Sequence, residues 1–176
     1  MDVVLNSGDT AWVLASSALV LLMTPGLAFF YGGMVRTKSV LNMMMMSFVT
    51  IGIVSSLWVF YGYNWAFGYD ADSKWIGSFG FENLANLTNT FTNNGGTYPI
   101  PTLAFSAFQL MFAIITPALI SGAIADRTKF ATWSIFVALW VSLVYFPVAH
   151  WVFDFGDKFG EELRGVGFLA GRGVLD

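Results

Sequence analysis

The sequence predicts an all-α, polytopic helical membrane protein with four transmembrane helices and the start of a fifth. Of its 176 residues, 56% are hydrophobic and 11% are charged, whereas soluble domains carry roughly 25% charged residues. The charges are also clustered, and they leave four long uncharged runs at residues 10–35, 39–69, 83–125 and 130–149. A water-soluble domain needs charge on the outer face of each helix, so a soluble globule is excluded.

The first two predicted spans cover residues 10–31 and 40–67. The flank before the first span carries Asp2 and Asp9 with no Lys or Arg, unlike the basic start of a signal peptide. We therefore expect this segment to be a membrane helix. The second span would extend roughly 42 Å at about 1.5 Å per residue, so it either tilts in the bilayer or projects beyond it.

The third and fourth spans are predicted at residues 102–125 and 130–149. Residues 68–101, between the second and third spans, are rich in Asn, Thr and Gly and predict an exposed loop. A second, glycine-rich loop is expected at residues 155–173. An apolar stretch begins where the chain stops, so we expect a single transmembrane domain over residues 1–176 that is the N-terminal portion of a longer protein.

The charges in the short linkers predict the orientation of the chain. Arg36 and Lys38 follow the first span, and Arg127 and Lys129 follow the third, against a single acid at Asp126. Basic residues concentrate in cytoplasmic loops. The N-terminus is therefore expected on the extracellular or periplasmic side of the cell membrane, and the long loops with it.

Composition argues against several kinds of chemistry in this chain. It has no cysteine, which excludes disulfides and thiolate metal sites, and a single histidine, His150. No Gly-x-Ser-x-Gly elbow occurs. The formal charge is −3 and the sequence has no basic patch, which argues against nucleic-acid binding. We expect no enzymatic activity, cofactor, metal or nucleic-acid partner.

An aromatic stripe marks the third span. Phe105, Phe108 and Phe112 are spaced i, i+3, i+7 and so share one helix face. Gln109 lies beside them and would be costly toward lipid, so we expect it to face a bundle or a cavity. Such a stripe is typical of core packing, but with Gln109 and Thr116 nearby it fits a pore that holds a small cation over the rings equally well.

The end of the fourth span and the glycines offer further candidates. The expected outer interface holds a cluster of His150, Trp151, Phe153 and Asp154. This cluster forms either an aromatic belt or a vestibule that attracts a cation. His150 is expected to make hydrogen bonds at that interface. Glycines within or at the ends of spans predict close helix contacts; they are Gly26, Gly32, Gly33, Gly52 and Gly122.

Several motifs, taken in order along the chain, resemble the ammonium transporter (Amt/Mep/Rh) family. FYGGMVR at residues 30–36 resembles its first-helix signature, and AFQ followed by Phe112 and then GAIADR at residues 122–127 resembles its third span. PVAHWV at residues 147–152 resembles the end of its fourth span, and GVLD at residues 173–176 the start of its fifth. The resemblance covers nearly the whole chain.

The resemblance implies a trimer of eleven-helix subunits, each with its own hydrophobic ammonium pore. Phe112 matches a ring of the family's outer gate, with Phe108 and Gln109 beside it. Asp176 matches a buried aspartate that supports the outer site without coordinating ammonium. Phe153 stands where the family usually has Trp, and it is the weaker cation–π partner and lacks the indole N–H.

The family's paired pore histidines and outer-site serine belong downstream of residue 176, and His150 matches neither histidine. The resemblance implies transport of ammonium or ammonia through a hydrophobic pore with an outer aromatic recruitment site, as part of a longer chain. Two alternatives remain: a truncated module that transports nothing and assembles with full-length subunits, and an ammonium sensor. The implied partners are ammonium or ammonia, the lipid bilayer, other copies in a homotrimer, and a cytoplasmic regulatory protein.

Overall fold

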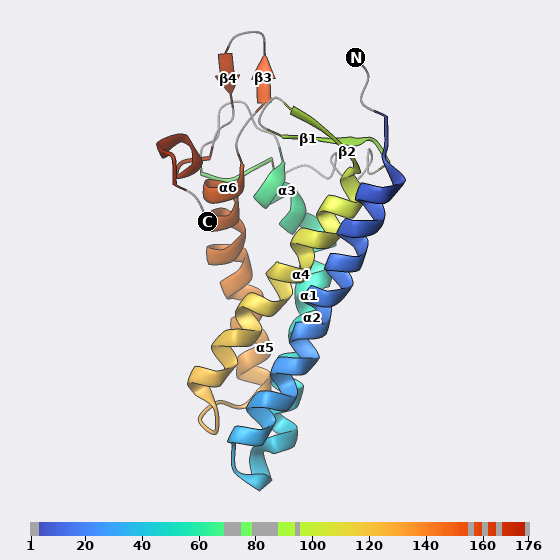
Figure 1. Ribbon diagram of the computed structural model, residues 1–176. Coiled ribbons are helices and arrows are strands. Elements are labelled where there is room, and N and C mark those ends of the chain that lie inside the picture. The colour runs from blue at the N-terminus through green and yellow to red at the C-terminus, as the bar shows by residue number, and fades with distance from the viewer. Residues whose placement is uncertain are drawn as a thin grey trace.

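The computed structural model describes residues 4–68, 75–78, 88–93, 96–154, 157–159, 162–164 and 167–174. Its described part is a bundle of four long helical spans (Figure 1). Each span is long and apolar enough to cross a membrane; their bounds are Ser7–Met34, Thr37–Phe67, Thr102–Ile124 and Phe130–Phe153. The predicted four-helix architecture is confirmed, although the fourth span continues to Phe153 where the sequence predicted an end at residue 149.

The first span is a single helix, α1 (Ser7–Met34), that starts at a capped end. The Asn6 side chain accepts hydrogen bonds from the backbone N–H groups of Gly8 and Asp9, at 2.8 and 3.2 Å. Such a cap satisfies donors that the first turn of a helix leaves unpaired. Asp9 also places a negative charge in the first turn, where the helix dipole favours it. The cap explains why α1 begins before residue 10, outside the apolar run.

The second and fourth spans each contain a π-helical turn. The second span comprises the 3₁₀ turn η1 (Thr37–Ser39), α2 (Val40–Leu57), the π turn η2 (Trp58–Gly62) and α3 (Tyr63–Phe67). The fourth comprises α5 (Phe130–Trp140), the π turn η5 (Val141–Tyr145) and α6 (Phe146–Phe153). The two π turns contact each other, because the Tyr61 and Ser142 hydroxyls lie 2.6 Å apart.

The third span joins α4 (Thr102–Ile120) to a 3₁₀ turn, η4 (Ser121–Ile124). Two antiparallel hairpins lie at the end of the bundle that holds the N-terminus, hereafter the hairpin end (Figure 1). They are β1 (Thr90–Asn93) with β2 (Gly96–Pro101), and β3 (Asp157–Phe159) with β4 (Glu162–Arg164), the latter followed by the 3₁₀ turn η6 (Ala170–Arg172). The sequence predicted plain loops in both places.

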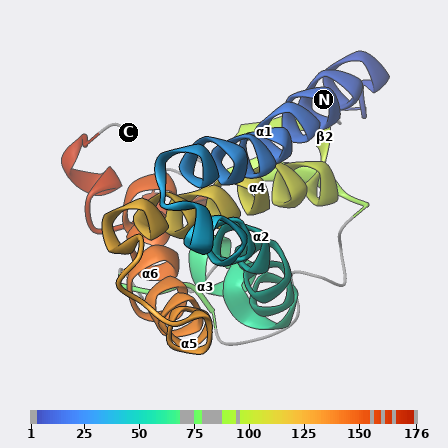
Figure 2. The same ribbon diagram turned by 90° about the horizontal axis from the view of Figure 1, so that it is seen from below.

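Helix α2 lies at the centre of the bundle, between α1 and α4 on one side and α5 on the other (Figure 2). Its contact with α5 includes the fully buried Trp133, whose indole N–H donates to the Met46 carbonyl at 2.7 Å. Near the hairpin end, α3 packs against α6. The largest fully buried side chains are shared among these helices and include Met43, Met46, Ile114, Trp133 and Phe146.

Close helix contact at glycine occurs at two of the five predicted positions. A Cβ at Gly122 would lie 2.6 Å from the Tyr31 ring, and the Tyr31 hydroxyl donates to the Leu119 carbonyl at 3.1 Å. A Cβ at Gly32 would lie 3.1 Å from the side chain of Met44. At Gly26, Gly33 and Gly52 a Cβ would meet no atom of the described residues within 4 Å, so close contact there stays a prediction.

The closest helix contact that sequence reasoning missed is at Gly62, in η2. A Cβ there would lie 2.5 Å from the Phe146 ring, which is fully buried and held by Trp58 and Tyr61 at centroid distances of 5.7 and 5.9 Å. The ring has no free space to move into. Gly62 therefore lets the π turn η2 approach the start of α6.

We expect Gly62→Ala to lower the free energy of unfolding by about 1–3 kcal/mol, as overpacking of a filled core does. The measurement is unfolding of the detergent-purified protein, in its native length, by titration with SDS. Gly52→Ala is the matched control, because its new methyl group would meet no atom of the described residues within 4 Å. Equal stability of the two variants would contradict the packing at Gly62.

Candidate functional site

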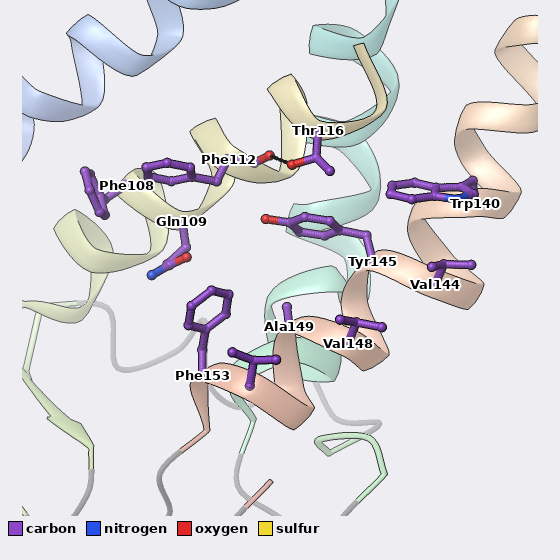
Figure 3. A pocket seen from close by; sticks show the side chains of 11 residues that line it. Phe108, Gln109, Phe112, Thr116, Trp140, Val144, Tyr145, Val148, Ala149 and Phe153 are labelled. Atoms are coloured by element: carbon purple, nitrogen blue, oxygen red, sulfur yellow. Dashed lines mark hydrogen bonds between the residues drawn. The ribbon is translucent and has the colours of Figure 1, made fainter. Parts of the chain in front are cut away.

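A cavity of about 460 Å³ lies between α4 and the segment that runs from α5 through η5 to α6 (Figure 3). Helix α4 contributes Phe108, Gln109, Phe112 and Thr116. The opposite wall consists of Trp140, Val144, Tyr145, Val148, Ala149, Val152 and Phe153. The cavity therefore joins residues of the third and fourth spans that are 24 to 45 positions apart in the chain.

Four of the five predicted site residues line this one cavity. Phe108, Gln109 and Phe112 reach it from α4, and Phe153 reaches it from the last turn of α6. Gln109 and Phe153 point toward each other across the space (Figure 3). The fifth, Asp176, lies outside the described residues.

The start of α4 is held by the neighbouring hairpin. The segment Pro99-Ile100-Pro101 precedes the helix, and proline disfavours a helical conformation in the residue before it. The Thr102 N–H and hydroxyl both donate to the Asn89 carbonyl, at 2.9 and 3.1 Å. From this start, the α-helical period brings residues 108, 109, 112 and 116 to the same face. That face is the wall of the cavity.

The three phenylalanines of the predicted stripe have different surroundings. The Phe108 and Phe112 rings make an edge-to-face contact at 5.1 Å in the cavity wall. Phe105, nearer the hairpin end, stacks on Phe91 of β1 at 3.7 Å and contacts Phe67 at 5.1 Å. Core packing therefore accounts for Phe105, whereas Phe108 and Phe112 face open space.

Sequence reasoning missed most of the opposite wall. Tyr145, Ala149 and Phe153 are spaced i, i+4, i+8, so following the helical period back from Phe153 would have found the other two. Of the remaining members, Val148 and Val152 belong to α6 and Val144 to the π turn at Val141–Tyr145, whereas Trp140 precedes that turn. A π turn holds more residues than an α turn and so changes how the side chains before it face the cavity. The sequence pattern does not predict that turn.

The cavity is apolar with a few polar groups. Its polar side chains include Gln109, Tyr145 and Thr116, and the Thr116 hydroxyl donates to the Phe112 carbonyl at 2.7 Å. No Asp, Glu, Lys or Arg is among the described residues that line it. A small cation that entered would lose most of its water. Aromatic faces and the Gln109 carbonyl oxygen are available to stabilise it in return.

His150, which is predicted to make hydrogen bonds at the outer interface, is fully buried in α6. Its Nδ1 lies 3.2 Å from the Ala66 carbonyl and 3.3 Å from the Asp154 carboxylate. Because both partners accept, Nδ1 carries the proton. His150 links the end of α6 to α3 and is absent from the residues that line the cavity.

Comparison with protein-family models gives a match over residues 11–175 to the model described as Ammonium Transporter Family. The chain belongs to this family. Its membership agrees with the four apolar spans and identifies it as a multi-pass membrane protein.

Individual relatives agree with the family. The chain is 52% identical to an ammonium transporter of Mycobacterium tuberculosis, over 96% of this chain and 39% of that protein. It is 40% identical to the ammonium transporter Amt1 of Archaeoglobus fulgidus, over 98% of this chain and 38% of the relative. The crystal structure of Saccharomyces cerevisiae Mep2 superimposes with a TM-score of 0.72 at 29% identity, over 86% of this chain and 33% of Mep2. The present chain thus spans about 39% of the length of the curated relatives it matches.

Proposed function

We propose that the chain contributes the outer aromatic recruitment site and part of the hydrophobic pore of an ammonium transporter, within a longer protein of the cell membrane. The observation that carries the proposal is the convergence of Phe108, Gln109, Phe112 and Phe153 on one apolar cavity. These residues come from two separate spans, and the resemblance to the family singled out all four. Membership of the Ammonium Transporter Family supports the substrate class.

In the proposed mechanism, ammonium leaves water at the mouth of the cavity and is held by the faces of Phe112 and Phe153. A desolvated cation–π contact contributes about 2 kcal/mol. The Gln109 carbonyl oxygen accepts one ammonium N–H, and the absence of a carboxylate from the described lining keeps the cation weakly held. Weak binding suits a site from which the substrate must move on.

We propose that the hairpin end faces the extracellular or periplasmic side. Arg36 and Lys38 lie in the turn between the first two spans, and Arg127 and Lys129 in the turn between the last two. Both turns lie at the end of the bundle opposite the N-terminus (Figure 1). The positive-inside rule places that end in the cytoplasm. The wall residue Phe153, at the end of α6, then lies toward the outer side.

The proposal extends to the parts that the family implies. Residues 1–176 form one transmembrane domain, three copies of the complete protein assemble as a homotrimer, and Asp176 supports the outer site without binding ammonium directly. A cytoplasmic regulatory protein would meet the basic end of the bundle. Each of these rests on the family resemblance and on the charge pattern.

Phe153→Trp tests the proposed site by strengthening it. Trp is the better cation–π partner and adds an N–H donor, so we expect the KM for methylammonium uptake to fall about two- to fivefold. Uptake is measured in proteoliposomes that contain the protein in its native length. The control is Phe29→Trp, at a position on α1 that is 65% exposed and does not line the cavity.

Two results would count against the proposal. Absence of saturable uptake by the wild-type protein would remove the transport function. Saturable uptake with the same KM in wild type and Phe153→Trp would leave transport in place but remove Phe153 from the recruitment site.

A further inference from the structure

Four side chains at the hairpin end form a stacked group that we call the aromatic clamp: Trp75, Trp151, Phe168 and Arg172. Trp151 belongs to the last turn of α6, whereas Trp75 comes from the described segment 75–78 and the other two from the segment 167–174. The clamp therefore joins three stretches of chain. None of its four members lines the cavity.

The clamp is built from ring and cation contacts. Trp75 stacks on Phe168 with centroids 4.8 Å apart and planes at 20°. Trp151 meets both rings edge-on, at 5.7 Å from Trp75 and 6.2 Å from Phe168. The Arg172 guanidinium carbon lies 4.1 Å from the centroid of Phe168. This distance is well inside the range of about 6 Å in which a cation–π contact is attractive.

Backbone groups tie the same segments to the end of α6. The Trp151 indole N–H donates to the Trp75 carbonyl at 2.7 Å. The Leu169 N–H donates to the Trp151 carbonyl at 3.0 Å, and the Gly167 N–H to the Asp154 carbonyl at 2.8 Å. The last carbonyls of a helix have no partner within the helix, and here the returning chain supplies donors to the end of α6.

Gly167 permits this close approach. A Cβ at this position would collide with the carbonyl oxygen of His150 and would lie 2.8 Å from that of Trp151. Residues 167–174 can therefore lie directly on the helix end.

The clamp and the cavity lie on opposite sides of the same helical turn. Trp151 and Phe153 are two positions apart, and residues so spaced on an α-helix point in nearly opposite directions. Phe153 lines the cavity while Trp151 is held in the clamp. Any rotation or fraying of this last turn would move the Phe153 ring, and a cation–π contact depends on the cation lying over the ring face.

We propose that the aromatic clamp is a positioning device that fixes the last turn of α6 and thereby orients Phe153 toward ammonium, with Arg172 closing the stack. This inference rests on the proposed function. Arg172 acts here through the contact of its guanidinium with the Phe168 ring and not through repulsion of the incoming cation. The clamp affects how well ammonium is recruited, and it leaves the later steps of transport unchanged.

Substitutions at Arg172 separate positioning from charge. Both Arg172→Gln and Arg172→Lys remove the guanidinium that contacts the Phe168 ring, so each should raise the KM for methylammonium about two- to fivefold while the maximal rate stays at the wild-type value. If Arg172 merely repelled incoming cations, Arg172→Gln would lower KM and Arg172→Lys would leave it unchanged. Arg172 is exposed, so folding should survive both changes.

Phe168 provides the second test, again with native-length protein in proteoliposomes. Phe168→Ala should raise KM at least as much as the Arg172 variants, and Phe168→Tyr, which keeps the ring, should restore the wild-type KM. Trp12→Ala is the control, at an aromatic residue of α1 that is 75% exposed. Its KM should match that of the wild type.

Three outcomes would overturn the inference. A wild-type KM in Arg172→Lys, or a lowered KM in Arg172→Gln, would show that Arg172 affects recruitment through its charge and not by positioning Phe153. A wild-type KM in Phe168→Ala would show that the clamp does not affect recruitment, and the proposed transport function would be unaffected. A wild-type protein without saturable uptake would remove the proposed function and the inference with it, so the two failures are distinguishable.

Discussion

Replacing Phe112 by Ala is expected to raise the KM for ammonium about tenfold or more, because a desolvated cation–π contact of about 2 kcal/mol is lost. The Phe112 side chain is 38% exposed and faces the cavity, so its removal should take little from the folded core. The variant should insert and fold normally. Uptake of labelled methylammonium by proteoliposomes that contain the native-length protein measures the change.

The matched control for Phe112 is Phe29→Ala. Phe29 is an exposed phenylalanine of α1 that does not line the cavity, and its truncation should leave KM at the wild-type value. If Phe112→Ala and Phe29→Ala behave alike, Phe112 contacts lipid or another helix and not the substrate.

Trp133→Ala should have the largest effect on stability, a loss of about 3–5 kcal/mol, as measured for large-to-small changes in well-packed cores. The Trp133 side chain is fully buried between α5 and α2 and donates to the Met46 carbonyl at 2.7 Å. Its ring also lies 5.5 Å from that of Phe136. Titration with SDS in detergent measures the free energy of unfolding.

Two companion variants separate the parts of this effect. Trp133→Phe keeps much of the ring and loses the hydrogen bond, so it should cost clearly less than Trp133→Ala. Trp12→Ala removes the same side chain from an exposed position and should cost little. Similar losses at Trp12 and Trp133 would contradict the placement of Trp133 in the core.

The four spans were predictable because lipid allows few alternatives. Backbone polar groups in a bilayer must be paired internally, so a long uncharged apolar run implies a helix. The errors lie at the ends, where polar residues still belong to the helix. Asn6 caps α1 before the apolar run begins, and the buried His150 lets α6 continue to Phe153.

The π turns and hairpins depend on contacts between distant residues, which a single sequence does not reveal. The two π turns meet through the Tyr61 and Ser142 hydroxyls, and neither residue marks a π turn by itself. Hairpin β1–β2 is anchored where Phe91 stacks on Phe105. A segment rich in Asn, Thr and Gly reads as a loop until that partner is known.

The candidate site was predictable on the α4 side and less so on the other. Gln109 beside an aromatic stripe pointed to a cavity, since an amide is costly toward lipid, and Gln109 does line one. The Phe153 assignment came from the family resemblance. Tyr145 was missed although it lies two α-helical turns before Phe153, because the family resemblance singled out Phe153 alone on this helix.

The central claim is that Phe112 and Phe153, on different helices, hold the same ammonium ion. A double-mutant cycle of Phe112→Ala and Phe153→Trp, read as KM for methylammonium uptake, tests it most directly. Side chains that share a ligand couple, whereas independent sites add. We expect Phe153→Trp to lower KM in the wild-type background and to have much less effect beside Phe112→Ala, because water would then enter the cavity and screen the cation. An equal change in both backgrounds would contradict the shared site.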